Sequence, residues 1–171
     1  GHPAEPYRGG TKAGIEHLGF RHGHRLRLLL ERCQFTHQRK HLRHIARFRP
    51  AKIVLFDLSE AAAYAIQTAL ADAFPQLPLA TVVGDVKHAA LVDEVLARER
   101  PSVIFHAGAY KHVPLMEETN AWQAVRNNAY GTWVLGKAAV AAKVEKFVLV
   151  SSDKAVNPTN VMGATKRLAE I

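Results

Sequence analysis

The sequence predicts an α/β domain built on a parallel sheet, and two observations carry this prediction. From about residue 51 onward, short apolar runs alternate with stretches in which apolar residues recur at helical spacing. The short runs are apolar throughout, as expected for strands that are buried on both faces of a sheet. Strands and helices that alternate in this way favour a doubly wound sheet with right-handed crossovers.

The elements follow one another at regular intervals. The first clear strand covers residues 52–56 and ends at Asp57, and Ser59 is placed to cap the helix that follows. Pro75 and Pro78 end that helix. Further strands are expected at residues 79–83, 102–105 and 146–150, and further helices over residues 91–96, 122–142 and 161–171.

The first 50 residues have a different composition from the rest of the chain. They hold 11 Lys and Arg against 3 Asp and Glu, whereas residues 51–171 hold 12 of each kind. A nucleic-acid-binding arm would account for this charge, but no aromatic or glycine spacing supports a known module. We therefore expect no nucleic-acid partner.

The basic segment gives weak signals of secondary structure. Residues 25–30 are compatible with a strand and residues 42–48 with a short helix, but the residues between them show no periodicity. We expect residues 1–41 to be an irregular basic segment, either a solvated tail or sequence that is not native to the domain. Residues 42–171 are then expected to form an incomplete doubly wound domain.

Other features narrow the class of protein. The single cysteine, Cys33, excludes an internal disulfide. No run of 18 apolar residues is present, and we find neither a secretory signal nor a set of metal ligands.

Three successive strand ends carry residues that suit a dinucleotide. Asp57 lies where a Rossmann domain places the acid that bonds an adenosine ribose, although an ordinary strand end is the simpler reading. Gly84 to Val86 follow the next strand, and three small residues follow His106, where short side chains allow a ribose or pyrophosphate to approach the backbone. The expected cofactor-binding residues at these ends are Asp57, Ser59, Glu60, Asp85, Val86, Ala107, Gly108 and Ala109.

The stretch from Ser151 to Lys166 carries the clearest chemistry. A strand runs into Ser152, Asp153 and Lys154, and a helix then places Met162 four residues before Lys166. Ser152, Met162 and Lys166 are spaced like the Ser, Tyr and Lys of a short-chain dehydrogenase/reductase, in which Tyr moves a proton and Lys holds the nicotinamide ribose. A thioether carries no proton, so Met162 does not take over the role of the Tyr.

Two longer motifs carry a resemblance to one family. They are Ser-Ser-Asp-Lys-Ala-Val-Asn-Pro-Thr-Asn-Val-Met-Gly-Ala-Thr-Lys, which begins at Ser151, and His-Ala-Gly-Ala-Tyr-Lys-His-Val-Pro-Leu-Met-Glu, which begins at His106. Residues from about 42 to 171 resemble the nucleotide-sugar 4,6-dehydratases of polysaccharide biosynthesis, an extended short-chain dehydrogenase/reductase group. Met162 is similar to the residue of the membrane-anchored, long-form branch.

The resemblance implies NAD or NADP as cofactor and a UDP-N-acetylhexosamine as substrate, with a 4-keto-6-deoxy sugar as product. Lys154 would take the C5 proton, and Asp153 would protonate the leaving C6 hydroxyl. Both carboxyl and amine would need burial to reach those protonation states. Ser152 would bond the C4 oxygen and Lys166 the nicotinamide ribose, while the group that deprotonates the C4 hydroxyl stays unassigned.

Three further residues are substrate-binding candidates. Lys111 and His112 follow the third strand end, where they suit a diphosphate or sugar hydroxyls or else form a solvated loop. Asn128 lies inside the long helix, for which Asn is a mediocre former. It is expected either to bond across to the active-site strand or to face solvent.

Two departures from the family point to a fragment. The family opens with a strand and a glycine-rich turn, expected near residues 26–38, but no glycine occurs from residue 24 to residue 83. The chain also ends before the part that binds the nucleotide-sugar, so we expect weak or no activity. The resemblance implies a cytoplasmic location, at the inner membrane for full-length relatives, and leaves a homo-oligomer open.

Two other functions stay open. One is a nucleotide-sugar epimerase or reductase of the same fold, against which the adjacent Asp153 and Lys154 argue. The other is a non-catalytic dinucleotide-binding or interaction module, with the basic segment as a docking arm.

Overall fold

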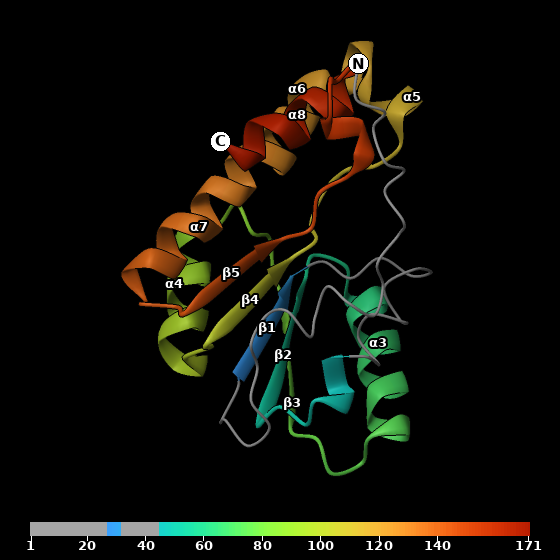
Figure 1. The fold of residues 1–171 in the computed structure, drawn as a ribbon. Helices are drawn as coiled ribbons and strands as arrows, with labels where there is room; N and C mark the ends of the chain where they lie inside the picture. Colours follow the sequence, from blue (N-terminus) through green and yellow to red (C-terminus); the bar gives the residue numbers. More distant parts are fainter. Residues whose placement is uncertain (1–26, 32–44) are drawn as a thin grey trace, which may run out of the picture.

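The fold centres on one parallel sheet of five strands, in the order β3-β2-β1-β4-β5 (Figure 1). It is seen in a computed structural model that describes residues 27–31 and 45–171. The strands are β1 (Arg27–Glu31), β2 (Lys52–Asp57), β3 (Leu79–Val83), β4 (Val103–His106) and β5 (Lys146–Leu149). The order reverses direction at β1, so the topological switch point, where such sheets bind ligands, lies between β1 and β4.

Helices connect the strands and extend beyond them. The longer ones are α3 (Glu60–Ala73), α4 (Ala89–Glu99), α7 (Gly131–Ala141) and α8 (Val161–Glu170). Short helices α5 (Val113–Met116) and α6 (Ala121–Ala124) lie between β4 and α7, and a π-helix, Val125–Tyr130, joins α6 to α7. Two 3-10 turns cover Glu118–Asn120 and Asp153–Ala155.

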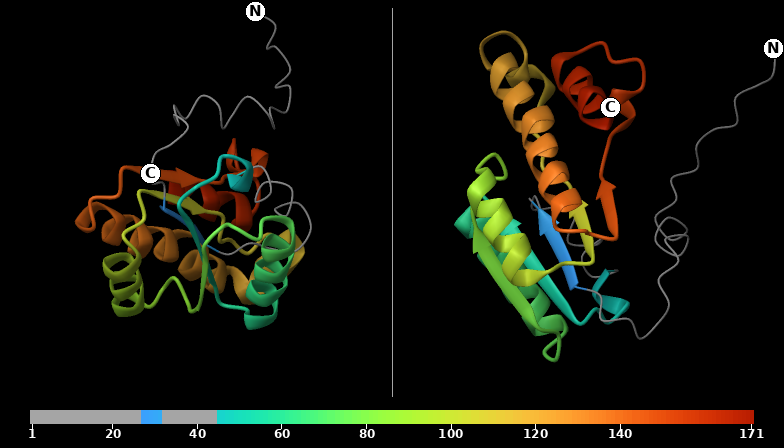
Figure 2. Two further views of the ribbon diagram at one scale, coloured as in Figure 1. Left: turned by 90° about the horizontal axis from the view of Figure 1, so that it is seen from below. Right: turned by 90° about the vertical axis from the view of Figure 1, so that its left-hand side faces the viewer.

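Both faces of the sheet are covered, as a doubly wound fold requires. Along β2, Val54 and Phe56 join the core cluster that contains the buried residues of α4 and α7, which lie side by side (Figure 2). The alternate residues Ile53 and Leu55 point the other way and pack with Ile66 and other residues of α3. Side chains alternate between the faces of a strand, so an unbroken apolar run fills both cores.

The predicted α/β class and parallel sheet are confirmed, and so is Ser59 as the cap of α3, since its hydroxyl accepts the N–H of Ala62. The irregular segment expected over residues 1–41 needs correction, because it contains β1. This strand pairs with β2 on one side and β4 on the other, so the sheet has no centre without it. Residues 32–44 lie outside the described residues, and with them the first part of the helix expected over 42–48.

In the described ranges, no helix is long and apolar enough to cross a bilayer.

An ion pair braces the amino edge of the sheet. Lys52, the first residue of β2, places its Nζ 2.5 Å from Oε2 of Glu99 at the end of α4. The Glu99 side chain is 8% exposed, and Arg98 Nε lies 3.1 Å from its other oxygen. The hydrogen bond from Lys52 is the main cause that lowers the pKa of Glu99, against the opposing effect of burial. The brace joins the strand that carries Asp57 to the helix that precedes β4.

We predict that Glu99→Gln lowers the free energy of unfolding at pH 7 by roughly 1–3 kcal/mol, because it leaves the Lys52 ammonium without its counter-charge. The pKa of Glu99 is lowered by folding, so its contribution exists above the pKa of the unfolded chain and is lost as pH falls through the folded value. The free energies of unfolding of Glu99→Gln and the parent, measured by urea titration, should therefore become equal in acid. Glu94→Gln, an exposed partner of Arg98, is the control, and equal stability of Glu99→Gln and the parent at pH 7 would contradict the prediction.

Candidate functional site

The residues expected to act on a ligand gather at the carboxyl edge of the sheet. Asp57 ends β2, Asp85 follows β3, His106 ends β4 and Ser151 follows β5. The chain leaves β4 and β5 toward α5, α6 and α8, which lie together beyond this edge (Figure 1). This is the edge at which open α/β sheets bind their ligands.

Asp57 is fixed by the start of α3. Its carboxylate is 5% exposed, and Oδ1 accepts the backbone N–H of Ser59 at 2.9 Å. Ser59 in turn caps α3 through its hydroxyl. Glu60 begins the helix on the exposed side. The carboxylate is thus held in one orientation at the end of a strand that neighbours β1 at the centre of the sheet.

The turn after β3 is held against α7. Oδ1 of Asp85 accepts the N–H of Lys87, and Oδ2 lies 2.8 Å from the Lys87 ammonium. Val86 is 5% exposed and packs so closely on α7 that a Cβ on Gly131 would come within 2.8 Å of it. The Val86 side chain therefore belongs to the core. The cofactor contact that the sequence predicted for this residue can come only from its backbone.

The small residues after β4 form a buried turn. Ala107, Gly108 and Ala109 are all buried, and so is the imidazole of His106. Nε2 of His106 lies 2.7 Å from Oγ1 of Thr132. The Thr132 hydroxyl donates its only proton to the carbonyl of Asn128 at 2.6 Å, so Nε2 of His106 must be the donor in its own bond.

Asn128 ties three segments together and is 1% exposed. Its Oδ1 accepts the N–H of Tyr110 at 2.8 Å and an N–H of the Asn127 amide at 3.1 Å. Its Nδ2 donates to the carbonyl of Tyr110 and to Oγ1 of Thr165 in α8. All four hydrogen-bonding positions of the amide are used within the chain. Asn128 therefore does not face solvent, and its long-range bonds go to the turn after β4 and to α8, which gives it a positioning role within the chain.

The helix that carries Asn128 is irregular at that point. The sequence predicted one helix over residues 122–142, but a π-helix from Val125 to Tyr130 interrupts it. The Thr132 hydroxyl bonds back to a carbonyl four residues earlier, a contact that bends helices. Single π-helical turns inside α-helices are frequent at functional sites. In the sequence, this irregular turn is marked by the pair Asn127 and Asn128 and by Thr132, four residues after Asn128.

Asp153 and Lys154 lie in the 3-10 turn after β5, which the Ser152 hydroxyl caps by accepting the N–H of Lys154. Their side chains are 88% and 49% exposed, with 3.6 Å between Lys154 Nζ and Asp153 Oδ1. The hydrogen bond from Ser152 and then the charge of Lys154 hold the pKa of Asp153 below its ordinary value. Asp153 was expected to be buried, with its pKa raised. It is instead exposed and its pKa is lowered, so that expectation is wrong for this arrangement.

Lys166 and Met162 occupy the buried side of α8. Lys166 is 3% exposed, and its Nζ donates to the carbonyl of Val150 at 2.7 Å, at the end of β5. Met162 is also 3% exposed and packs in a cluster with Met116 and Ala124. Met162 thus fills space between α5, α6 and α8.

Lys111 and His112 are exposed in the turn between β4 and α5.

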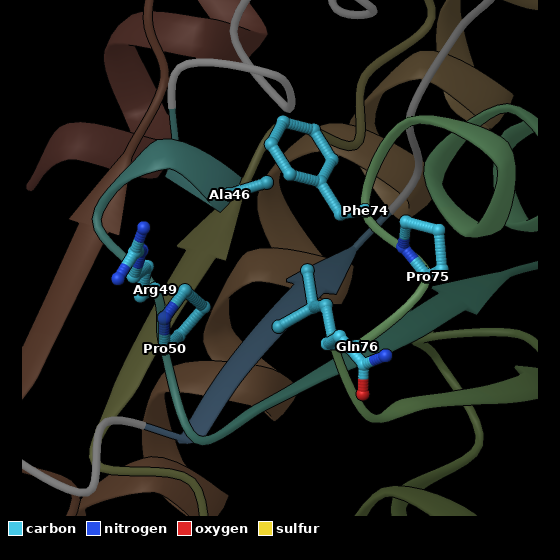
Figure 3. Close-up of a pocket in the computed structure, with 7 residues that line it drawn as sticks. Ala46, Arg49, Pro50, Phe74, Pro75 and Gln76 are labelled. Carbon is cyan, nitrogen blue, oxygen red and sulfur yellow. The ribbon is translucent and has the colours of Figure 1, made fainter.

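A cavity of about 460 Å³ lies at the opposite end of the sheet (Figure 3). It is bounded by residues that precede β2 and β3, namely Ala46, Arg49, Pro50, Phe74, Pro75, Gln76 and Leu77. None of the predicted site residues lines it, so it is separate from the carboxyl edge. Among the described residues, no cluster of three or more His, Cys, Asp or Glu is arranged to hold a metal.

We predict that Asn128→Ala lowers the free energy of unfolding by roughly 2–4 kcal/mol, because it leaves buried groups of Tyr110 and Thr165 without partners. Gln123→Ala, which removes an exposed amide from the same helical stretch, is the matched control. Urea unfolding of the two variants measures the difference. Equal losses in both variants would show that the Asn128 bonds contribute little.

We predict that Ser152→Ala raises the pKa of Asp153 toward its ordinary value, because it removes the hydroxyl that bonds Oδ1 at 3.0 Å. Carboxyl carbon NMR shifts measured against pH report this change directly. Ser151→Ala is the control, since that hydroxyl bonds Glu170 instead. An unchanged titration of Asp153 in Ser152→Ala would show that the hydroxyl does not act on it.

Comparisons with known proteins agree with the fold and the motifs. The family described as "Polysaccharide biosynthesis protein" matches residues 36–171. The capsular polysaccharide biosynthesis protein CapD of Staphylococcus aureus is 42% identical over 130 residues, which cover 75% of this chain and 22% of that protein. The crystal structure of Pen from Bacillus thuringiensis is 32% identical, with a TM-score of 0.76, and the match covers 85% of this chain and 45% of that one.

A more distant structure shows the shared fold alone. The UDP-glucose 4-epimerase from Bifidobacterium longum, solved with NAD⁺ and UDP, is 20% identical with a TM-score of 0.71, over 84% of this chain and 47% of that one. The chain spans about half the length of the solved structures and about a fifth of the curated relative CapD. The family match covers most of the sequence and agrees with the resemblance carried by the two motifs: the chain belongs to the polysaccharide biosynthesis protein family.

Proposed function

We propose that this chain carries the catalytic edge of an NAD(P)-dependent 4,6-dehydratase that acts on a UDP-N-acetylhexosamine. The observation that supports this most is the adjacent Asp153 and Lys154, set on a capped turn directly after β5. Loss of water from a sugar needs an acid at one carbon and a base at the next, and two neighbouring side chains of opposite kind meet that need. The activity belongs to the protein that contains this chain.

The described residues suit the adenosine half of the cofactor. The oriented carboxylate of Asp57 ends β2 where a Rossmann domain places the acid that bonds the ribose, and the residues after β4 have short side chains, Ala107 and Ala109, that would let a ribose approach the backbone. Residues 32–44, which follow β1, contain no glycine, so the usual glycine-rich cradle for the pyrophosphate is missing from the sequence. Bound NAD(P)⁺ would supply the transient oxidation of the sugar at C4, and the return of the hydride to C6, with a proton to C5, would give the 4-keto-6-deoxy product and regenerate the cofactor.

The roles of the side chains follow from that oxidation. A carbonyl at C4 makes the C5 proton acidic, so Lys154, once neutral, would accept it. Asp153 would give its proton to the C6 hydroxyl, which leaves as water. Asp153 must be protonated for this step, and its lowered pKa in the exposed turn opposes that. A bound sugar that covers the turn would withdraw solvent from both groups and shift Asp153 toward the protonated form.

Lys166 would stand at the nicotinamide ribose, already oriented by its bond to Val150. Ser152 would bond the oxygen at C4. Lys111 and His112, exposed in the turn between β4 and α5, would bind a diphosphate or sugar hydroxyls.

A 4-epimerase is the second candidate. It is favoured by the UDP-glucose 4-epimerase of Rickettsia canadensis, which is 42% identical over 88 residues, or 52% of this chain. An epimerase returns the hydride to C4 of the oxidised sugar and removes no proton from C5. It therefore has no use for a paired acid and base at residues 153 and 154.

We predict that Lys154→Ala lowers the rate of water loss from UDP-N-acetylglucosamine by about 10²-fold or more, because the general base is removed. Mass spectrometry of the sugar nucleotide measures the loss of one water. Lys137→Ala, an exposed lysine on α7, is the control. Undiminished water loss in Lys154→Ala would remove this mechanism, and formation of the C4 epimer by the parent protein would favour the second candidate.

A further inference from the structure

Glu117 connects two segments that lie far apart in the sequence. Its Oε1 accepts the backbone N–H of Val161 at 2.9 Å, across 44 residues. Val161 is the first residue of α8, and the first four N–H groups of a helix have no partner within it. Asn160 already caps the helix by accepting the N–H of Gly163 at 2.8 Å. Glu117 therefore adds a tie from another segment to a helix that has its own local cap.

The first turn of α8 rests on the backbone of Lys154. A Cβ on Gly163 would come within 2.1 Å of the carbonyl oxygen of Lys154 and 3.2 Å of Pro158. Only a residue without a side chain permits this approach. Helix and turn are thus in direct backbone contact, and a displacement of the first turn of α8 displaces the backbone that carries the Lys154 side chain.

The other end of the tie belongs to the segment that begins with the exposed turn of Lys111 and His112 and continues through α5. Glu117 follows α5 directly, and Met116 at the end of α5 packs against Met162 of α8. Apolar packing by itself lets a short helix slide or rotate, whereas a hydrogen bond to a backbone N–H sets one position. The carboxylate thus fixes the register between the two family motifs.

We propose that Glu117 is a positioning residue that holds the first turn of α8, and through Gly163 the backbone of Lys154, in place for proton abstraction. This rests on the proposed function of Lys154. A small misplacement of a reacting group lowers rate more than substrate affinity, so removal of the carboxylate should act on kcat.

The test compares Glu117→Ala, which removes the acceptor, with Glu117→Gln, which keeps one acceptor oxygen. Glu118→Ala removes the neighbouring exposed carboxylate and is the control. Two readouts are needed. One is kcat and KM for water loss from UDP-N-acetylglucosamine, and the other is amide hydrogen exchange, followed by mass spectrometry, across residues 153–163 and across α3 as a distant reference.

For Glu117→Ala we expect kcat to fall by about 10–10²-fold with KM within about threefold of the parent. Exchange should accelerate across residues 153–163 and stay unchanged in α3. Glu117→Gln should recover kcat to within about threefold, because its amide oxygen still accepts the Val161 N–H. Glu118→Ala should match the parent in both readouts.

Unchanged exchange across residues 153–163 in Glu117→Ala would overturn the tie, with or without turnover. Faster exchange with an unchanged kcat would overturn its role in positioning Lys154. A parent protein that exchanges as expected but never removes water would instead overturn the proposed function, and with it the catalytic part of this proposal, while the exchange data still support the tie.

Discussion

The buried amide of Asn128 is the interaction on which the carboxyl edge of the sheet depends. It joins the turn after β4, the π-helix and α8 with four hydrogen bonds. The backbone carbonyl of Asn128 also accepts the Thr132 hydroxyl, which in turn is bonded to His106. An amide buried in this way is costly unless every position is satisfied, so the network is stable only as a whole. The position of Lys166 follows from it, because Thr165, the residue before Lys166, is one of the three residues that the amide bonds.

The proposed acid and base stand outside this rigid network. Asp153 and Lys154 lie on an exposed turn, fixed at its backbone by Ser152 and Gly163 but with side chains in solvent. The backbone around the site is thus held by hydrogen bonds, whereas the side chains of Asp153 and Lys154 can change conformation. The hydrogen bond from Ser152 and the charge of Lys154 lower the pKa of Asp153 in the exposed turn. The protonation state needed for elimination must therefore come from whatever covers the turn, and a sugar substrate is the cover that the proposed reaction provides.

Much of the fold could be predicted from the sequence, because buried parallel strands are apolar along their whole length and the helices between them keep their period. β1 was assigned with less success: its apolar run was recognised, but the basic residues around it favoured a tail. The ends of β2 to β5 were predicted to within one residue. For Asn128 a bond to another segment was one of two expectations, but its partners could not be named, and neither could that of Glu117, because these bonds join residues 18 to 44 positions apart.

The central claim is that Lys154 removes a proton from C5 during loss of water. The most direct measurement is NMR of the product formed from UDP-N-acetylglucosamine in deuterium oxide by the protein that contains this chain. A proton taken by a lysine exchanges with solvent before it is returned, so the account predicts a dehydrated 4-keto product that carries deuterium at C5. A C4 epimer that has lost no water and carries no deuterium at C5 would contradict it.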